Sequence, residues 1–193
     1  MGTGTSLHVG VNVTDPFKLG AGRFQTLFGC DLAADAMADI AAARGFERVV
    51  TLVDSSATRD AVVTWLGAAA ATCQVGDSAL VTFAGHGTLM RDLEEDARRW
   101  RHALVLHDGT LAADELVHLL GGFRAGVHVV LVADCCFGGA ITSTLARADV
   151  KANVRVLTAT SEGARAPGAK APGEIPPFTR ALSEAWRTGS ADF

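Results

Sequence analysis

Two short segments of the chain carry side chains that could perform chemistry. His86 stands between two glycines, directly after an apolar run. Asp134, Cys135 and Cys136 end another apolar run. A cysteine attacks as the thiolate, which needs a base or a positive field nearby. A histidine and a cysteine in these positions therefore indicate nucleophilic catalysis, provided that folding brings them together.

The two adjacent cysteines are expected to differ. Neighbouring side chains of an extended chain point in opposite directions, so one can face the core while the other faces a cleft. We interpret Cys135 as a small buried hydrophobe. Cys136, which precedes the turn Phe137-Gly138-Gly139, is the reactive candidate. Two simpler interpretations stay open: His86 as an ordinary loop histidine, and both cysteines as core residues.

The elements that must position these residues alternate between β-rich and Ala-rich runs. Strands are predicted at 7–13, 49–53, 79–84, 127–133 and 154–159, and helices at 31–44, 58–73, 111–120, 141–147 and 179–187. Runs that are apolar throughout are typical of strands covered on both faces. The alternation predicts a parallel sheet with right-handed crossovers. Because ligands bind beyond the carboxyl ends of such strands, one cleft could hold both His86 and Cys136.

The composition excludes several classes of protein. Of the 193 residues, 49% are hydrophobic and 20% are charged, which excludes a disordered chain. The net charge of −4 argues against a nucleic-acid partner, and no apolar run approaches the ~18 residues that span a bilayer. Four cysteines are too few for a disulfide scaffold, so a reducing, cytoplasmic setting without a membrane partner is expected.

No motif for a metal or a nucleotide is found. The phosphate-binding loop signatures are absent, and no signal peptide is recognised at residues 1–13. The remaining histidines lack zinc spacing: His8, His102, His107, His118 and His128. We therefore predict one domain over residues 1–193, with no cofactor and no metal. Two stretches, about 88–102 and 163–177, are predicted to be mobile loops because the first is rich in charge and the second in proline and glycine.

Both motifs resemble those of the caspase-like cysteine peptidases, the family that includes the metacaspases. Residues 81–87 resemble the apolar strand that ends in Ser-Gly-His-Gly, with Ala84 in place of the serine. Residues 132–139 resemble the Asp-x-Cys-x-(Ser/Gly)-Gly turn, with Cys136 at the catalytic position. A histidine about 50 residues before the cysteine is also a caspase feature. The resemblance covers about residues 7–188 and points to a bacterial metacaspase-like or orthocaspase-like protein.

The resemblance implies a fold and a mechanism. The fold is an α/β, three-layer sandwich with a mostly parallel sheet of about six strands and helices on both faces. The activity is that of a cysteine endopeptidase acting on a protein or peptide. Cys136 would attack the peptide carbonyl, while His86 would promote the thiolate and protonate the leaving amine. The backbone N–H groups of Gly87 and Cys136 would hold the oxyanion.

The resemblance also implies a specificity. Metacaspases carry an acid in the specificity pocket two residues before the cysteine, and Asp134 stands there. An anionic wall favours Arg or Lys before the scissile bond. The family's second acid falls at Ala33, which is not acidic; Asp31 or Asp35 could substitute, and Asp31 is closer to the expected loop. As an alternative, Asp134 would cap the helix that starts near Gly138.

Regulation and the competing functions remain open. The acids of 92–96 stand among arginines on both sides of the run, which favours a solvated face over a calcium site, although calcium activation stays an option. Arg165 and Lys170 are candidate self-cleavage sites, and activation could come from a partner or a homodimer. The alternatives to a peptidase are a catalytically silent interaction module and a Cys–His hydrolase that acts on a non-peptide amide or thioester.

Overall fold

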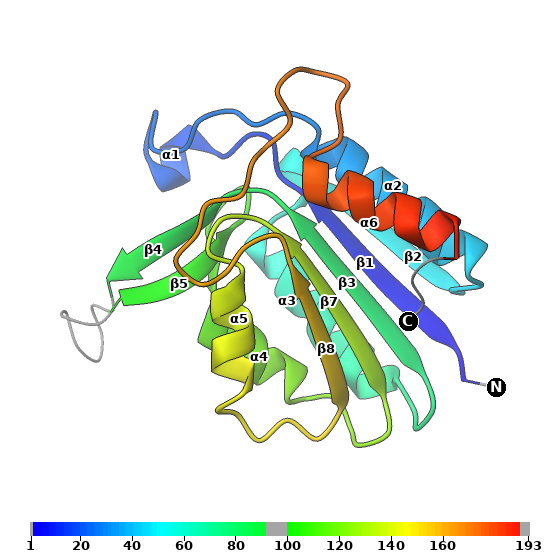
Figure 1. Cartoon of the computed structure of the whole chain (residues 1–193). Coiled ribbons are helices and arrows are strands. Elements are labelled where there is room, and N and C mark those ends of the chain that lie inside the picture. The colour runs from blue at the N-terminus through cyan, green and yellow to red at the C-terminus, as the bar shows by residue number, and fades with distance from the viewer. Residues whose placement is uncertain (1, 92–99, 190–193) are drawn as a thin grey trace.

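A parallel sheet of five strands forms the centre of the molecule (Figure 1). The structure, a computed structural model, describes residues 2–91 and 100–189. The strands run in the order β2 (Arg48–Val53), β1 (Gly4–Gly10), β3 (Ser78–Ala84), β7 (His128–Asp134) and β8 (Asn153–Thr158). All four pairings are parallel, as predicted. The central sheet of the described chain thus has one strand fewer than the six or so expected.

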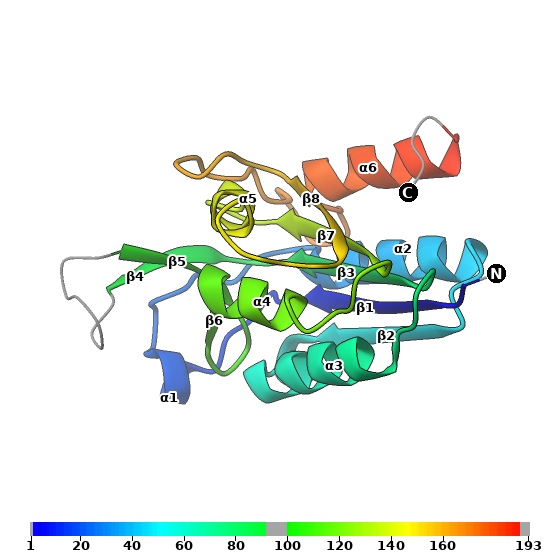
Figure 2. The same ribbon diagram turned by 90° about the horizontal axis from the view of Figure 1, so that it is seen from below.

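The helices cover both faces of this sheet, which confirms the three-layer arrangement (Figure 2). On one face lie α2 (Cys30–Ala43) and α6 (Pro177–Arg187), and on the other α3 (Arg59–Thr72), α4 (Ala113–Leu120) and α5 (Gly139–Leu145). The chain first steps outward from β1 to β2, then returns past β1 to β3, β7 and β8. Since parallel crossovers are right-handed, this reversal places α2 on the opposite face from α3, α4 and α5.

The strands β3 and β7 each contribute side chains to two cores, which explains why their sequences are almost entirely apolar. Leu7, Val9 and Leu131 point into the larger core with α3, α4 and α5. Leu80 and Val132 point the other way, into a smaller core with α2 and α6. Alternate residues of one strand are thus buried on opposite faces.

A second, antiparallel sheet projects beside the carboxyl ends of the central strands (Figure 1). It consists of β4 (Gly87–Arg91), β5 (Trp100–Val105) and β6 (Thr110–Ala112). The prediction of a loop over 88–102 was therefore wrong at both ends, because 87–91 pairs with 100–104 as a ladder. Residues 92–99, with the predicted solvated acids Asp92, Glu94, Glu95 and Asp96, lie outside the described residues.

The segment 163–177 contains no helix or strand before α6, as its prolines and glycines predicted. Figure 1 shows this segment, in orange, crossing the carboxyl end of the sheet. A short helix, α1 (Pro16–Leu19), and a 3₁₀ turn at Asp54–Ser56 complete the structure. Among the described helices, none is long and apolar enough to cross a membrane.

Candidate active site

His86 and Cys136 lie at the ends of neighbouring strands. In the pairing of β3 with β7, Ala84 stands opposite Asp134. His86 and Cys136 each follow two residues beyond that pair, so the register of the sheet brings them to the same place. Both side chains are half-buried, and both line one small cavity of about 60 Å³. The topology therefore joins the two segments that the sequence singled out.

Gly87 allows the two strand ends to approach closely. A Cβ atom at this position would lie 1.8 Å from the carbonyl oxygen of Cys136, which no side chain can occupy without moving the backbone. The glycine after His86 thus has a steric reason besides the oxyanion role predicted for its N–H. Of the hydrogen bonds among the described residues, none is donated by the Cys136 N–H, so this group is available to a ligand.

The His86 ring is held by the segment that precedes α2. Its Nε2 atom lies 2.7 Å from the carbonyl oxygen of Gln25. Because a carbonyl can only accept, Nε2 carries the hydrogen and donates, which leaves Nδ1 with a free lone pair. The Phe24 ring also packs against the imidazole, with centroids 5.5 Å apart. The sequence analysis missed both residues, since nothing in this irregular segment signals a contact with a histidine 61 residues away.

The cysteines differ as predicted. Cys135 is 2% exposed and belongs to the larger core. Burial, followed by the charges of Asp134 and Cys136, raises the pKa of its thiol, which keeps it protonated. Cys30 also lines the cavity, but burial raises the pKa of its thiol to about 12. Cys136 is the cysteine that lines the cavity and is half-exposed.

The turn after Cys136 adopts an uncommon backbone conformation. Phe137 has a φ of 61°, a left-handed value that costs a residue with a side chain on the order of 1–3 kcal/mol. Two bonds from the chain after β8 hold the turn: Phe137 N–H donates to the Ala164 carbonyl at 2.8 Å, and Gly138 N–H to Thr160 Oγ1 at 3.2 Å. Strain of this kind is common where a functional side chain must be presented.

The segment 163–177 lies over Cys136. The N–H of Ala166 donates to Cys136 Sγ at 3.3 Å, and Pro167 and Gly168 line the cavity. Farther along, Glu174 packs so tightly on Gly29 that a Cβ there would lie 1.8 Å from the Glu174 carbonyl oxygen. The remaining 60 Å³ equals the volume of roughly two water molecules. The segment therefore narrows the space beside Cys136.

Asp134 lines the same cavity and is 6% exposed. Its Oδ2 atom accepts two hydrogen bonds from Thr179, one from N–H at 3.0 Å and one from Oγ1 at 2.7 Å. Burial raises the pKa of this carboxyl, and the two Thr179 bonds oppose that rise. The alternative prediction of a helix cap named the wrong helix: Asp134 caps the first turn of α6, whereas α5 begins without a side-chain cap.

Asp31 is not brought to this cavity. It lies in the first turn of α2, where its Oδ1 accepts a hydrogen bond from Asn12 Nδ2 at 2.8 Å. The residue of this turn that lines the cavity is its neighbour Cys30, because the two side chains leave the helix in different directions. Of the two predicted acids, Asp134 lines the cavity and Asp31 does not, although the charges of both help to raise the pKa of the Cys30 thiol.

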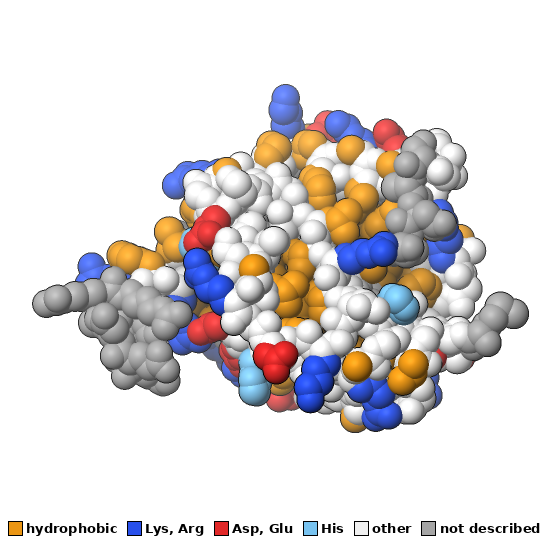
Figure 3. Space-filling view, turned by 60° about the horizontal axis from the view of Figure 1, so that its bottom comes forward, with side chains coloured by type: hydrophobic (Ala, Val, Ile, Leu, Met, Phe, Trp, Pro, Cys, Tyr) orange, Lys and Arg blue, Asp and Glu red, His pale blue; other side chains and the backbone are white. Residues whose placement is uncertain are grey.

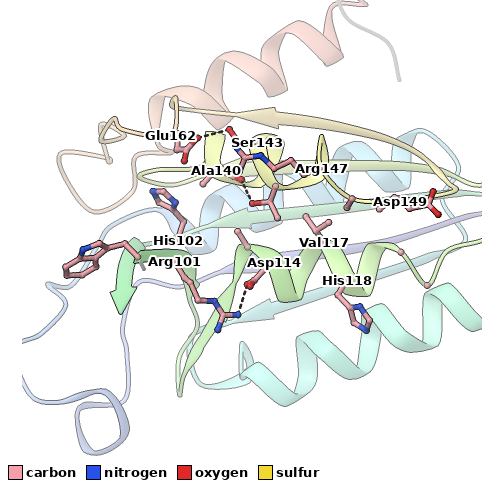
Figure 4. Close-up of a pocket in the computed structure, with 17 residues that line it drawn as sticks. Arg101, His102, Asp114, Val117, His118, Ala140, Ser143, Arg147, Asp149 and Glu162 are labelled. Carbon is pink, nitrogen blue, oxygen red and sulfur yellow. Dashed lines mark hydrogen bonds and ion pairs between the residues drawn. The ribbon is translucent and has the colours of Figure 1, made fainter. Parts of the chain in front are cut away.

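A larger cavity of about 740 Å³ opens between β5, α4 and α5. Charged side chains of both signs surround a hollow with apolar walls (Figure 3). Inside it, Arg101 pairs with Asp114 at 2.7 Å and Ser143 donates to Glu162 at 2.7 Å (Figure 4). Neither His86 nor Cys136 lines it. Within the described parts of the chain, no three His, Cys, Asp or Glu side chains are grouped as a metal site.

Comparison with known proteins agrees with the arrangement of strands and turns. The chain is 29% identical to protein GSU0716 from Geobacter sulfurreducens, with a TM-score of 0.84 over 98% of this chain and 84% of that one. It also resembles caspase-1 from Spodoptera frugiperda in fold, with a TM-score of 0.63 and 18% identity, over 97% of this chain and 69% of that one. No curated protein is significantly similar in sequence. Residues 5–145, well over half of the chain, match the model of the metacaspase, peptidase C14 domain, and the chain therefore belongs to that family.

Proposed function

We propose that this protein is a cysteine endopeptidase in which Cys136 is the nucleophile and His86 the base. The observation that carries the proposal is the meeting of both side chains on one cavity at the ends of β3 and β7. The hydrogen bond of His86 Nε2 to Gln25 supports it, because it leaves Nδ1 free to take a proton. Membership of a peptidase family supports the same chemistry.

The proposed reaction has two stages. His86 Nδ1 takes the proton of Cys136 Sγ, and the thiolate attacks the peptide carbonyl carbon. The oxyanion is stabilised by the N–H groups of Gly87 and Cys136, and the His86 imidazolium gives its proton to the leaving amine. Water, deprotonated by His86, then hydrolyses the thioester and restores the thiol. The steps need no metal and no cofactor, and calcium, if it acts, acts on conformation.

The proposed specificity is for Arg or Lys before the scissile bond. Its support is the buried Asp134 carboxylate on the wall of the cavity that holds the nucleophile. A guanidinium or an ammonium group would pair with this charge where water is largely excluded. The competing role of Asp134, as a cap of α6, is compatible with this one, because the cap uses Oδ2 alone.

The chain itself offers one peptide bond to this site. Arg165 precedes the bond whose N–H contacts Cys136 Sγ, whereas Lys170 follows farther along the covering segment. Arg165 is therefore the stronger of the two self-cleavage candidates. A chain that stays intact during long incubation of active enzyme would contradict self-cleavage. We also propose activation by a partner or a homodimer, and a location in the cytoplasm. No contact in the described structure bears on these two points.

The test compares the wild type with Cys136→Ala and, as a matched control, Cys135→Ala. Each is incubated with fluorogenic peptides that end in Arg, Lys or Asp, with and without calcium. We expect cleavage after Arg and Lys, reduced by at least about 10³-fold in Cys136→Ala and retained in Cys135→Ala if that variant folds. Cleavage after Asp would contradict the Asp134 pocket but keep the dyad.

Iodoacetamide labelling separates the remaining outcomes. Labelling of Cys136 in a protein without turnover on these peptides would indicate a missing activator or a non-peptide amide as substrate. Absence of both turnover and labelling would favour the catalytically silent interaction module. Intact-mass measurement on wild type and Cys136→Ala identifies the labelled residue directly.

A further inference from the structure

Among the described residues, Thr179 is the one that hydrogen-bonds the Asp134 carboxylate, and it does so twice. Its N–H and its Oγ1 both donate to Oδ2, at 3.0 Å and 2.7 Å. Oδ1 of Asp134 accepts no hydrogen bond from the described residues, although the side chain lines the cavity. One oxygen of the carboxylate is thus fixed to the protein, and the other is left for a ligand.

The sequence at the start of α6 explains why this contact forms. Pro176 is the N-cap residue and Pro177 the first helical residue, so the helix begins without a side-chain cap and with one N–H fewer. The Asp134 carboxylate, which comes from β7, takes the place of the cap at the positive end of the helix. Thr179 is 2% exposed, so this contact is shielded from water.

We propose that Thr179 is a positioning residue for substrate specificity, which holds Asp134 so that Oδ1 faces the side chain of the incoming Arg or Lys. The inference rests on the proposed function, because it assumes that Asp134 receives a basic side chain. Thr179 itself touches neither the substrate nor the reacting atoms. Its backbone bond survives any side-chain substitution, so the hydroxyl bond is the part that mutation can test.

The same contact controls the charge of Asp134. Burial raises the pKa of this carboxyl, and the hydrogen bonds from the Thr179 side chain and backbone lower it. Loss of the hydroxyl bond removes one of the lowering effects, so Asp134 takes up its proton at a higher pH. The KM for basic peptides rises as the pH falls through that pKa, and in the variant this rise begins at a higher pH.

Other groups face Asp134 and must be separated from it. Cys30 of α2 and Cys135 both interact with its charge, but both thiols have raised pKa values and stay protonated at neutral and acidic pH. His86 and Cys136 line the same cavity and take part in the proposed reaction with either substrate. A peptide ending in citrulline, the uncharged counterpart of arginine, reports these two groups without Asp134. The ratio of the two substrates therefore isolates the carboxylate.

The experiment measures KM and kcat of Thr179→Val and Thr179→Ser for matched Arg and citrulline peptides across pH. We expect Thr179→Val to raise KM for Arg about two- to tenfold, with kcat and the citrulline peptide unchanged and the Arg midpoint shifted to higher pH. Thr179→Ser should restore wild-type values. Ser183→Ala is the control, because Ser183 is a buried hydroxyl of the same helix that donates to Arg180 instead.

Two other results would overturn the inference. Equal effects of Thr179→Val on both peptides, without a pH shift, would show a merely structural role. A wild-type enzyme that cleaves both peptides equally would remove the Asp134 specificity itself, and that failure is visible before any Thr179 variant is made. If Thr179→Val does not fold, Thr179→Ala replaces it with the same expectations.

Discussion

Two cavities of this molecule differ in the chemical groups that line them as well as in size. The larger one, about 740 Å³ between β5, α4 and α5, holds paired charges such as Arg101 with Asp114. The smaller one, about 60 Å³, holds a histidine with one free nitrogen, a half-exposed thiol and a carboxylate with one free oxygen. The larger cavity lies beside α4 and α5, whereas the smaller one lies at the carboxyl ends of β3 and β7. We therefore expect chemistry in the cavity where polar groups with an unused hydrogen-bonding atom lie close together, and not in the cavity with the greater volume.

The largest expected difference between the cavities is the response to loss of a histidine. His86→Ala should lower kcat/KM by about 10²–10⁴-fold, because the thiol loses the base that ionises it. His118→Ala, an exposed histidine of the larger cavity, should change kcat/KM less than about twofold. Peptide cleavage assays on both variants test this. Comparable losses in the two variants would contradict our assignment of the chemistry to the smaller cavity.

Close packing of the two strand ends predicts the next effect. Gly87→Ala places a Cβ against the Cys136 carbonyl, which should cost about 1–3 kcal/mol of stability and displace the nucleophile, lowering kcat by about 10²-fold. Gly67→Ala is the control, because a Cβ at this position in α3 meets nothing within 4 Å. Thermal unfolding and kcat should be measured for both. Wild-type activity in Gly87→Ala would show that the strand ends are free to separate.

The smallest expected effect concerns the cover of the smaller cavity. Ala166→Pro removes the N–H that donates to Cys136 Sγ, so iodoacetamide should alkylate Cys136 about two- to tenfold faster. Ala171→Pro is the control, since its N–H donates no hydrogen bond within the described chain. The rates follow from intact-mass measurements over time. Equal rates in both variants would mean that this bond does not protect the thiol.

The parts of the fold and site that follow from local pattern were predictable. The central strands β3 and β7 are buried on both faces, so their sequences are almost entirely apolar, and the alternation with helices predicts a parallel sheet. In such a sheet the carboxyl ends of strands are neighbours, which is why His86 and Cys136 could be paired from sequence. The opposite orientations of Cys135 and Cys136 follow from the same geometry.

The parts that depend on irregular segments were not predictable. Gln25 contacts His86 across 61 residues of sequence, and Thr179 contacts Asp134 across 45. The loops that bring these residues to the site have no sequence periodicity. The cap role of Asp134 was assigned to the helix next in sequence, whereas the contact forms with α6 because two prolines leave that helix without a cap. The strands β4 and β5 were hidden by the charged residues around them, although their pairing is regular.

The covering segment has a consequence for how any ligand of this site is ranked. We expect the segment to open before a ligand binds, so the apparent dissociation constant of every ligand is its intrinsic value divided by the same open fraction. If about 1% of molecules were open, each ligand would bind about 100-fold more weakly than to the open form. Absolute KM values then measure how often the protein opens. The ratio of the KM values of two ligands reports how well each fits the pocket, because the open fraction cancels in that ratio.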